Sequence, residues 1–135
     1  MSGTHEHLVQ LRWSDPDSYG HVNHARALSL LEDARLAMAS DAPGTVDGRL
    51  PDIILARLEV DYLRQLYYRM GEVLTVRSWV ARIGTKSVTV RQELMQDDAA
   101  AIRADGVCVM FDITTDTSRA LTDQERAYWA GFLVE

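Results

Sequence analysis

The second half of the chain consists of long strand-like runs separated by short breaks. Four runs rich in Val, Ile, Leu, Tyr and Thr have the composition of β-strands. They cover about residues 52–63, 73–83, 87–96 and 102–114. The breaks before the last three runs include residues 69–72, 84–86 and 97–98. Their hairpin or near-hairpin length predicts that the last three strands are antiparallel neighbours in one sheet.

The N-terminal part of the chain changes its hydrophobic period once. Residues 8–13 alternate apolar and polar side chains, which predicts a first, half-buried strand. The segment 14–20 contains a proline, a glycine and two aspartates, and is typical of a turn. Residues 24–40 then follow a helical period, with Asn23 as the expected N-cap. The apolar face of this helix comprises Ala27, Leu31, Ala34 and Met38.

These elements predict an α+β domain in which a five-stranded antiparallel sheet curls around one long helix. A loop is expected at 41–51, and a capping-box pattern at 122–125 opens a short helix that ends near Ala130. We expect residues 1–135 to form a single domain, because the chain is too short for two substantial cores. Long edge strands are usually paired or covered, so we expect a homodimer or homotetramer whose sheets join edge to edge.

Composition excludes several classes of function. The formal net charge is −6 and the basic residues are scattered, which argues against binding to nucleic acid. No apolar stretch approaches the roughly 20 residues of a membrane-spanning helix, and the N-terminus lacks a signal segment, so we expect a cytoplasmic protein without a membrane partner. The single cysteine, Cys108, lies on a predicted strand and is expected to be a buried hydrophobe. His21 and His24 have no further ligands nearby, so no metal site is expected.

Polar residues with catalytic chemistry gather in front of the long helix. Asp15, Asp17, His21, Asn23 and His24 lie in the turn and at the helix start. A helix N-terminus offers unpaired backbone amides and a positive dipole end, which suit a carbonyl oxygen that becomes an oxyanion. A nearby carboxylate can attack the carbonyl or activate water. The same residue types commonly form Asx turns and helix caps, and the pattern alone leaves both roles open.

The turn and the helix start form one continuous motif. Residues 12–24 read Arg-Trp-Ser-Asp-Pro-Asp-Ser-Tyr-Gly-His-Val-Asn-His, and residues 32–35 of the helix read Glu-Asp-Ala-Arg. The pattern, with its Asp-x-Asp-x-x-Gly-His-Val-Asn core, resembles the signature of the 4-hydroxybenzoyl-CoA thioesterase branch of hotdog-fold thioesterases. The order of elements is similar over nearly the whole chain, including a Gly-x-x-Ser step at 84–87. The resemblance implies a hotdog fold and hydrolysis of acyl-CoA thioesters to a free carboxylic acid and CoA.

The resemblance also implies which residues carry the chemistry. The second aspartate of the motif is the family's catalytic carboxylate, acting as nucleophile or as general base for water, and it matches Asp17. The backbone amide that polarises the thioester carbonyl matches the helix start near His24. The other hotdog branch keeps a catalytic glutamate on this helix, which would match Glu32, but the glycine-rich loop that precedes it there is absent. The resemblance therefore implies catalytic positions at Asp17 and His24, with Glu32 held in reserve.

Other residues are expected to support the site. The supporting loop comprises Asp15, Gly20, His21 and Asn23, which shape the turn and cap the helix. Lys86 and Ser87 match the position where some relatives contact the nucleotide end of coenzyme A. No cofactor is expected, because coenzyme A is part of the substrate, which is an acyl thioester of CoA or of a carrier protein.

Two other functions are compatible with the same resemblance in fold. A hotdog hydratase or dehydratase also acts on acyl thioesters, but its signature places a histidine five residues after its aspartate, whereas Asp17 and His21 are four apart. A non-catalytic module that binds acyl thioesters or assembles with other chains is the second alternative, since a fold does not determine a function.

Overall fold

The computed structural model describes residues 3–43 and 52–134, so most of the predicted 41–51 loop lies outside it. The strands are β1 (His5–Gln10), β2 (Ile53–Tyr62), β3 (Val73–Ile83), β4 (Ser87–Gln96), β5 (Ala99–Asp112) and β6 (Thr117–Ser118). The helices are α1 (His24–Ser40) and α2 (Asp123–Ala130). Neither helix combines the length and the apolar character that crossing a membrane requires, within these described ranges.

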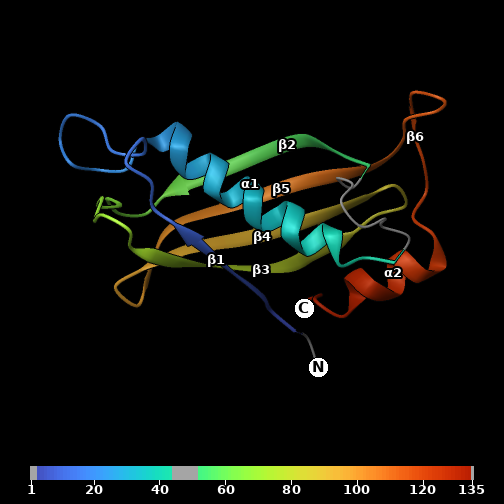
Figure 1. The fold of residues 1–135 in the computed structure, drawn as a ribbon. Helices are drawn as coiled ribbons and strands as arrows, with labels where there is room; N and C mark the ends of the chain where they lie inside the picture. Colours follow the sequence, from blue (N-terminus) through green and yellow to red (C-terminus); the bar gives the residue numbers. More distant parts are fainter. Residues whose placement is uncertain (1–2, 44–51, 135) are drawn as a thin grey trace.

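The strands form one antiparallel sheet in the order β1-β3-β4-β5-β2, with β6 paired to the end of β5 (Figure 1). The predicted antiparallel pairing of β3, β4 and β5 is confirmed. The five predicted strands are present, but the count of five was too low for the described chain, because β6 makes a sixth. Asp116, with a φ of 57°, lies in the turn that brings Thr117 and Ser118 back to β5. Two polar residues have no hydrophobic period from which a strand could be predicted.

Two strand boundaries also differ from the predicted ones. β1 lies earlier than the predicted 8–13, because the Asp15 side chain accepts a hydrogen bond from the backbone N–H of Arg12 and holds that end of the segment in a turn. β5 begins at Ala99 rather than at 102. It follows a tight turn at 97–98 in which both residues have a positive φ, and its first residues are alanines, which have little preference for strands.

Helix α1 lies across one face of the sheet and supplies much of the core (Figure 1). Its predicted apolar face is confirmed, since Ala27, Leu31, Ala34 and Met38 are at most 1% exposed. The first part of α1 packs in a cluster with β1, β3, β4 and β5, and its last turns pack in a second cluster that includes Trp129 of α2. The hydroxyl group of Tyr128 donates a hydrogen bond of 2.6 Å to the carbonyl oxygen of Met38, which ties α2 to α1.

Strand β2 is the least covered strand of the main sheet. α1 contacts β1, β3 and β4, whereas β2 lies at the opposite edge and most of its residues are exposed. Leu58 and Val60 still pack on the core, but Ile54, Leu55 and Tyr62 are 40–50% exposed. The sheet therefore presents an open apolar edge beside the helix, and two cavities are lined in part by β2 or by the segment that follows it.

Candidate functional site

Asp17 stands at a tight turn that fixes one of its two carboxylate oxygens. Its Oδ1 accepts hydrogen bonds from the backbone N–H groups of Tyr19 at 2.9 Å and His21 at 3.2 Å. Its own backbone N–H donates to the carbonyl oxygen of His21 at 2.8 Å. Gly20 has a φ of 76°, a left-handed conformation that a glycine adopts without strain and that closes the turn. Oδ2 makes no hydrogen bond with the described residues, so this carboxylate oxygen is free to react with a ligand or a water molecule.

The buried side chain of Asp15 stabilises the same loop. Its side chain is 0% exposed and accepts from the backbone N–H of Arg12 at 2.7 Å and from the guanidinium Nη2 of Arg12 at 2.9 Å. Its carbonyl oxygen accepts from the backbone N–H of Asn23 at 2.8 Å. Asp15 therefore connects the turn after β1 to the residue that caps α1, and its position is that of a loop-shaping residue.

The start of α1 leaves a backbone donor unused. The side chain of Asn23 accepts from the backbone N–H of Ala25 at 2.9 Å, so the predicted cap is confirmed. The backbone N–H of His24, one residue earlier, finds no acceptor in the part of the chain that the structure describes. The orphan amide sits at the positive end of the helix, where a developing negative charge is stabilised.

A cavity of about 430 Å³ joins these features. It lies between the start of α1 and the segment at the end of β2, and its walls come from Asp17, His21, Val22, His24, Ala27, Tyr62, Arg64, Gln65, Leu66 and Ile102. The rings of His24 and Tyr62 meet edge to face with centroids 6.3 Å apart. The cavity has an apolar floor at Leu66 and Ile102 and polar groups at its mouth, an arrangement that suits a molecule with an apolar tail and a reactive polar head.

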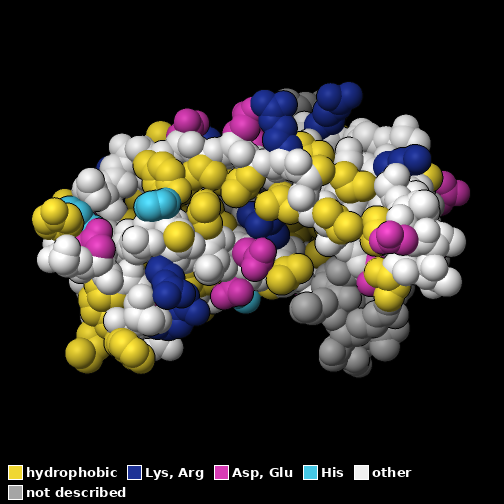
Figure 2. All heavy atoms as spheres, turned by 90° about the horizontal axis from the view of Figure 1, so that it is seen from above, with side chains coloured by type: hydrophobic (Ala, Val, Ile, Leu, Met, Phe, Trp, Pro, Cys, Tyr) yellow, Lys and Arg dark blue, Asp and Glu magenta, His cyan; other side chains and the backbone are white. Residues whose placement is uncertain are grey.

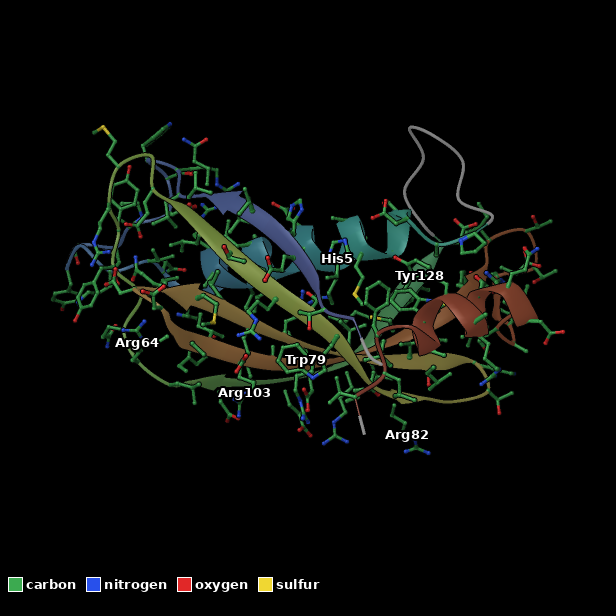
Figure 3. The ribbon with its side chains drawn as sticks, turned by 90° about the horizontal axis from the view of Figure 1, so that it is seen from below. His5, Arg64, Trp79, Arg82, Arg103 and Tyr128 are labelled. Atoms are coloured by element: carbon green, nitrogen blue, oxygen red, sulfur yellow. The ribbon has the colours of Figure 1, made fainter. Side chains whose placement is uncertain are left out.

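The sequence motif did not indicate the residues that come from the end of β2. Arg64, labelled in Figure 3, lines the cavity, and its Nη2 donates a hydrogen bond of 2.9 Å to the carbonyl oxygen of Ala99. Tyr62 is the last residue of β2 and Arg64 follows it by two residues. A polar cluster at a strand end is a signal that could have identified both.

The structure brings some of the predicted site residues together and separates others. Asp17, His21 and His24 line the same cavity. Lys86 and Ser87 lie at the start of β4, at the opposite end of the sheet from the Asp17 loop (Figure 1). Glu32 does not line the Asp17 cavity either, but a smaller one farther along α1. One chain alone thus keeps the predicted CoA-contacting pair away from Asp17.

Two further expectations concern cysteine and metal chemistry. Cys108 is buried, and this burial raises the pKa of its thiol despite the opposing charge of Arg35, so the thiolate is disfavoured. Within residues 3–43 and 52–134, no three His, Cys, Asp or Glu side chains are grouped so that they could hold a metal ion.

Comparison with known proteins places these features in a family. The sequence model of the thioesterase-like superfamily matches residues 11–129. No curated protein matches the chain.

Solved structures of proteins described as thioesterases resemble the chain in fold. A protein described as a predicted thioesterase from Bacillus stearothermophilus is 25% identical, with 98% of each chain covered and a TM-score of 0.86. A thioesterase from Thermus thermophilus, crystallised with coenzyme A and Zn, is 27% identical, covers 91% of this chain and 94% of its own, and has a TM-score of 0.76. A thioesterase superfamily protein from Jannaschia sp. CCS1 shares the fold at 24% identity, 96% and 93% coverage and a TM-score of 0.83. The hotdog fold implied by the motif is confirmed.

Proposed function

Since the chain belongs to the thioesterase-like superfamily, we propose that it hydrolyses acyl-CoA thioesters to a carboxylic acid and CoA with Asp17 as the reacting carboxylate. One observation carries the proposal: Asp17 and His24, whose backbone amide is unpaired among the described residues, line the same cavity at the start of α1. The Thermus thermophilus relative, crystallised with coenzyme A, supports CoA as the thiol part of the substrate.

In the proposed reaction the thioester carbonyl lies at the mouth of the cavity. Its oxygen accepts from the backbone N–H of His24, and the positive end of α1 stabilises the negative charge that develops there. Asp17 either attacks the carbonyl carbon and expels the CoA thiolate, forming an anhydride that water then hydrolyses, or removes a proton from the attacking water. The two amides hold Oδ1, which leaves Oδ2 free of hydrogen bonds among the described residues for either role.

We propose further that two chains pair through β2 to complete the site. β2 is a long strand at the edge of the sheet, and a two-fold axis beside it would make the two copies of β2 antiparallel. Lys86 lies at the Ile53 end of β2, because its carbonyl oxygen accepts from Met110, which is paired with Ile53. Antiparallel pairing would therefore bring the partner's Lys86 toward the Tyr62 end, where the Asp17 cavity lies.

The test is release of free thiol from a panel of short, long and aromatic acyl-CoA thioesters. Replacing Asp17 by Asn keeps the size of the side chain but removes the nucleophile or base, and should lower kcat by roughly 10² or more. Asp33→Asn, an equal change at an exposed position of α1, is the matched control and should leave kcat near wild type.

Unchanged turnover in Asp17→Asn would remove Asp17 from the mechanism. Tight binding of an acyl-CoA without hydrolysis by the wild type would favour a binding module, and hydration of an unsaturated acyl-CoA would favour the hydratase reaction.

A further inference from the structure

A second cavity, of about 80 Å³, lies farther along α1 and contains a buried charge. It opens between the second half of α1 and the strands β2 and β5, and its walls are Glu32, Arg35, Leu36, Ala39, Ile53, Leu55, Val90, Cys108 and Trp129. Arg35 is only 9% exposed, whereas Glu32 is exposed at the rim. Most of the other walls are apolar, so the guanidinium is the positively charged group of this cavity.

The guanidinium of Arg35 is held in place without a neutralising partner among the described residues. Its Nη1 donates a hydrogen bond of 3.1 Å to Oε1 of Gln92. The Gln92 side chain is fixed in turn, since its Nε2 donates to the carbonyl oxygen of Leu31 at 3.0 Å and to Oγ of Ser78 at 3.1 Å. No carboxylate in the described part of the chain lies within 4 Å of the Arg35 nitrogens. A buried cation without a counterion is costly, so a site of this kind favours an anionic ligand.

The strand beneath Arg35 makes room for its side chain. A Cβ placed on Gly106 of β5 would lie 3.5 Å from Cδ of Arg35 and 3.2 Å from Cδ1 of Leu55. Because Gly106 has no side chain, the stem of Arg35 can lie flat on β5 and carry its guanidinium to the cavity. The arginine is therefore a fitted part of the core and not a surface side chain that happens to fold inward.

Both cavities have walls from α1 on one side and from β2 or the segment after it on the other. Ala27 lines the first and Arg35 the second, and eight residues of helix place them roughly 12 Å apart at about 1.5 Å per residue. Along β5, Ile102 lines the first cavity and Gly106 underlies Arg35, a separation of roughly 13 Å at about 3.3 Å per residue. Figure 2 shows basic and acidic side chains near the middle of this face, between groups of hydrophobic ones.

We propose that Arg35 binds a carboxylate at the far end of the acyl group, so that the preferred substrates are CoA monothioesters of medium-length dicarboxylic acids. The proposal rests on the proposed function, because the thioester end of the same molecule occupies the Asp17 cavity. The methylene chain lies along the apolar inner side of β2, where Leu58 and Val60 pack on the core, and its terminal carboxylate pairs with the guanidinium.

The test compares kcat/KM for three acyl-CoA substrates of equal chain length that end in a carboxylate, a hydroxyl or a methyl group. Wild type should prefer the carboxylate over the methyl substrate by at least about tenfold, and Arg35→Met should lose that preference. Arg82→Met is the matched control, because Arg82 is exposed on β3 and points away from α1 (Figure 3). A ratio of substrates does not depend on how much of a variant is folded.

A second variant tests the charge without touching the buried network. Glu32→Gln removes a negative charge at the exposed rim of the cavity and should strengthen the carboxylate preference by roughly twofold to fivefold. An unchanged or weaker preference in Glu32→Gln contradicts the proposal, as does equal use of the carboxylate and methyl substrates by wild type. A preference for the hydroxyl substrate would mean that the site binds a neutral polar terminus and not a carboxylate, and would also overturn the proposal.

The last measurement separates the binding site from the hydrolysis. A free medium-chain dicarboxylic acid should raise the melting temperature of wild type but not of Arg35→Met, even if no thioester is cleaved. Hydrolysis of simple acyl-CoA substrates without this shift supports the thioesterase and overturns the carboxylate site. If Arg35→Met changes the molecular mass in light scattering and leaves the substrate ratio unchanged, the guanidinium pairs with a carboxylate of the partner chain and the proposal is wrong.

Discussion

At the scale of single residues, the two aspartates of the motif have opposite surroundings. Asp17 is exposed, whereas the side chain of Asp15 is fully buried and accepts hydrogen bonds from both the backbone N–H and the guanidinium of Arg12. We predict that Asp15→Asn lowers the free energy of unfolding by about 1–3 kcal/mol, because it removes the charge that pairs with the Arg12 guanidinium and one of the two oxygens that accept from Arg12 inside a buried side chain. Urea denaturation measures this, with the exposed Asp33→Asn as a control that should stay within about 0.5 kcal/mol. An equal change in the free energy of unfolding for both variants would mean that Asp15 does not stabilise the loop.

The residue scale also separates what the sequence could predict from what it could not. Spacing in the motif predicted that Asn23 caps the helix, and this is confirmed. The buried position of Arg35 had a weaker signal: it is four residues after Leu31 and so shares its side of the helix, but an arginine on an apolar face usually reaches out to water. Gly106 and Gln92, far away in the sequence and close in the fold, explain why the side chain stays inside.

At the scale of elements, α2 is held at its start by a network that the sequence predicted in part. The capping box of Thr122 and Glu125 is confirmed. The sequence did not reveal that Arg119 binds both oxygens of Glu125, at 2.7 and 2.9 Å, because that pairing depends on how the chain turns after β6. Hydrogen bonding to Arg119 is the main cause that lowers the pKa of Glu125.

That shift gives α2 a defined acid sensitivity. Because the pKa of Glu125 is lower in the folded state, its contribution is fully present above the unfolded-state pKa of about 4.3 and is lost as the pH falls from there through the folded-state pKa. We predict that Glu125→Gln costs about 1–2 kcal/mol at neutral pH and that the difference from wild type shrinks in this acidic window. Denaturation across the pH range measures it. Glu59→Gln, in an exposed pair with Arg57, is the control and should cost about 0–1 kcal/mol, and a constant difference for Glu125→Gln at every pH would contradict the assignment.

Strand and helix boundaries show where periodicity is a sufficient guide. The predicted helix at 24–40 and the strands at 73–83 and 87–96 agree with α1, β3 and β4, because long runs with a clear period and clear breaks define their own ends. β1, β5 and β6 differ because their ends are set by the Asp15 bond to Arg12, by an alanine run and by a turn at Asp116. These causes are tertiary or local turn chemistry, which a period does not encode.

At the scale of the whole molecule, the open edge of β2 decides whether the proposed site is complete. In an antiparallel ladder, residues alternate between those bonded to the neighbour and those whose backbone groups point away from it. The backbone N–H of Leu63 donates to Ala101 of β5, so the N–H of Val60, three residues earlier, points away from β5 and toward any partner strand. The corresponding residue on the other edge is Leu8 of β1. The backbone N–H of Leu11 donates to the carbonyl oxygen of Glu72, so the N–H of Leu8, three residues earlier, points away from β3.

These two positions allow a matched test of the dimer. Proline removes a backbone donor and is tolerated at an edge where that donor faces outward, so Val60→Pro and Leu8→Pro each remove one outward-facing donor on opposite edges. Val60 also packs on the core, whereas Leu8 is exposed, so Val60→Ala, which keeps the donor, separates the loss of the side chain from the loss of the donor. We predict that Val60→Pro shifts the molecular mass in light scattering toward a monomer and lowers thioesterase kcat/KM roughly tenfold or more, because the partner's Lys86 no longer reaches the CoA end of the substrate. Leu8→Pro should keep both the mass and the activity of wild type. A monomeric wild type would contradict the proposed β2 dimer. A lower molecular mass in Leu8→Pro alone would show that the interface lies at β1.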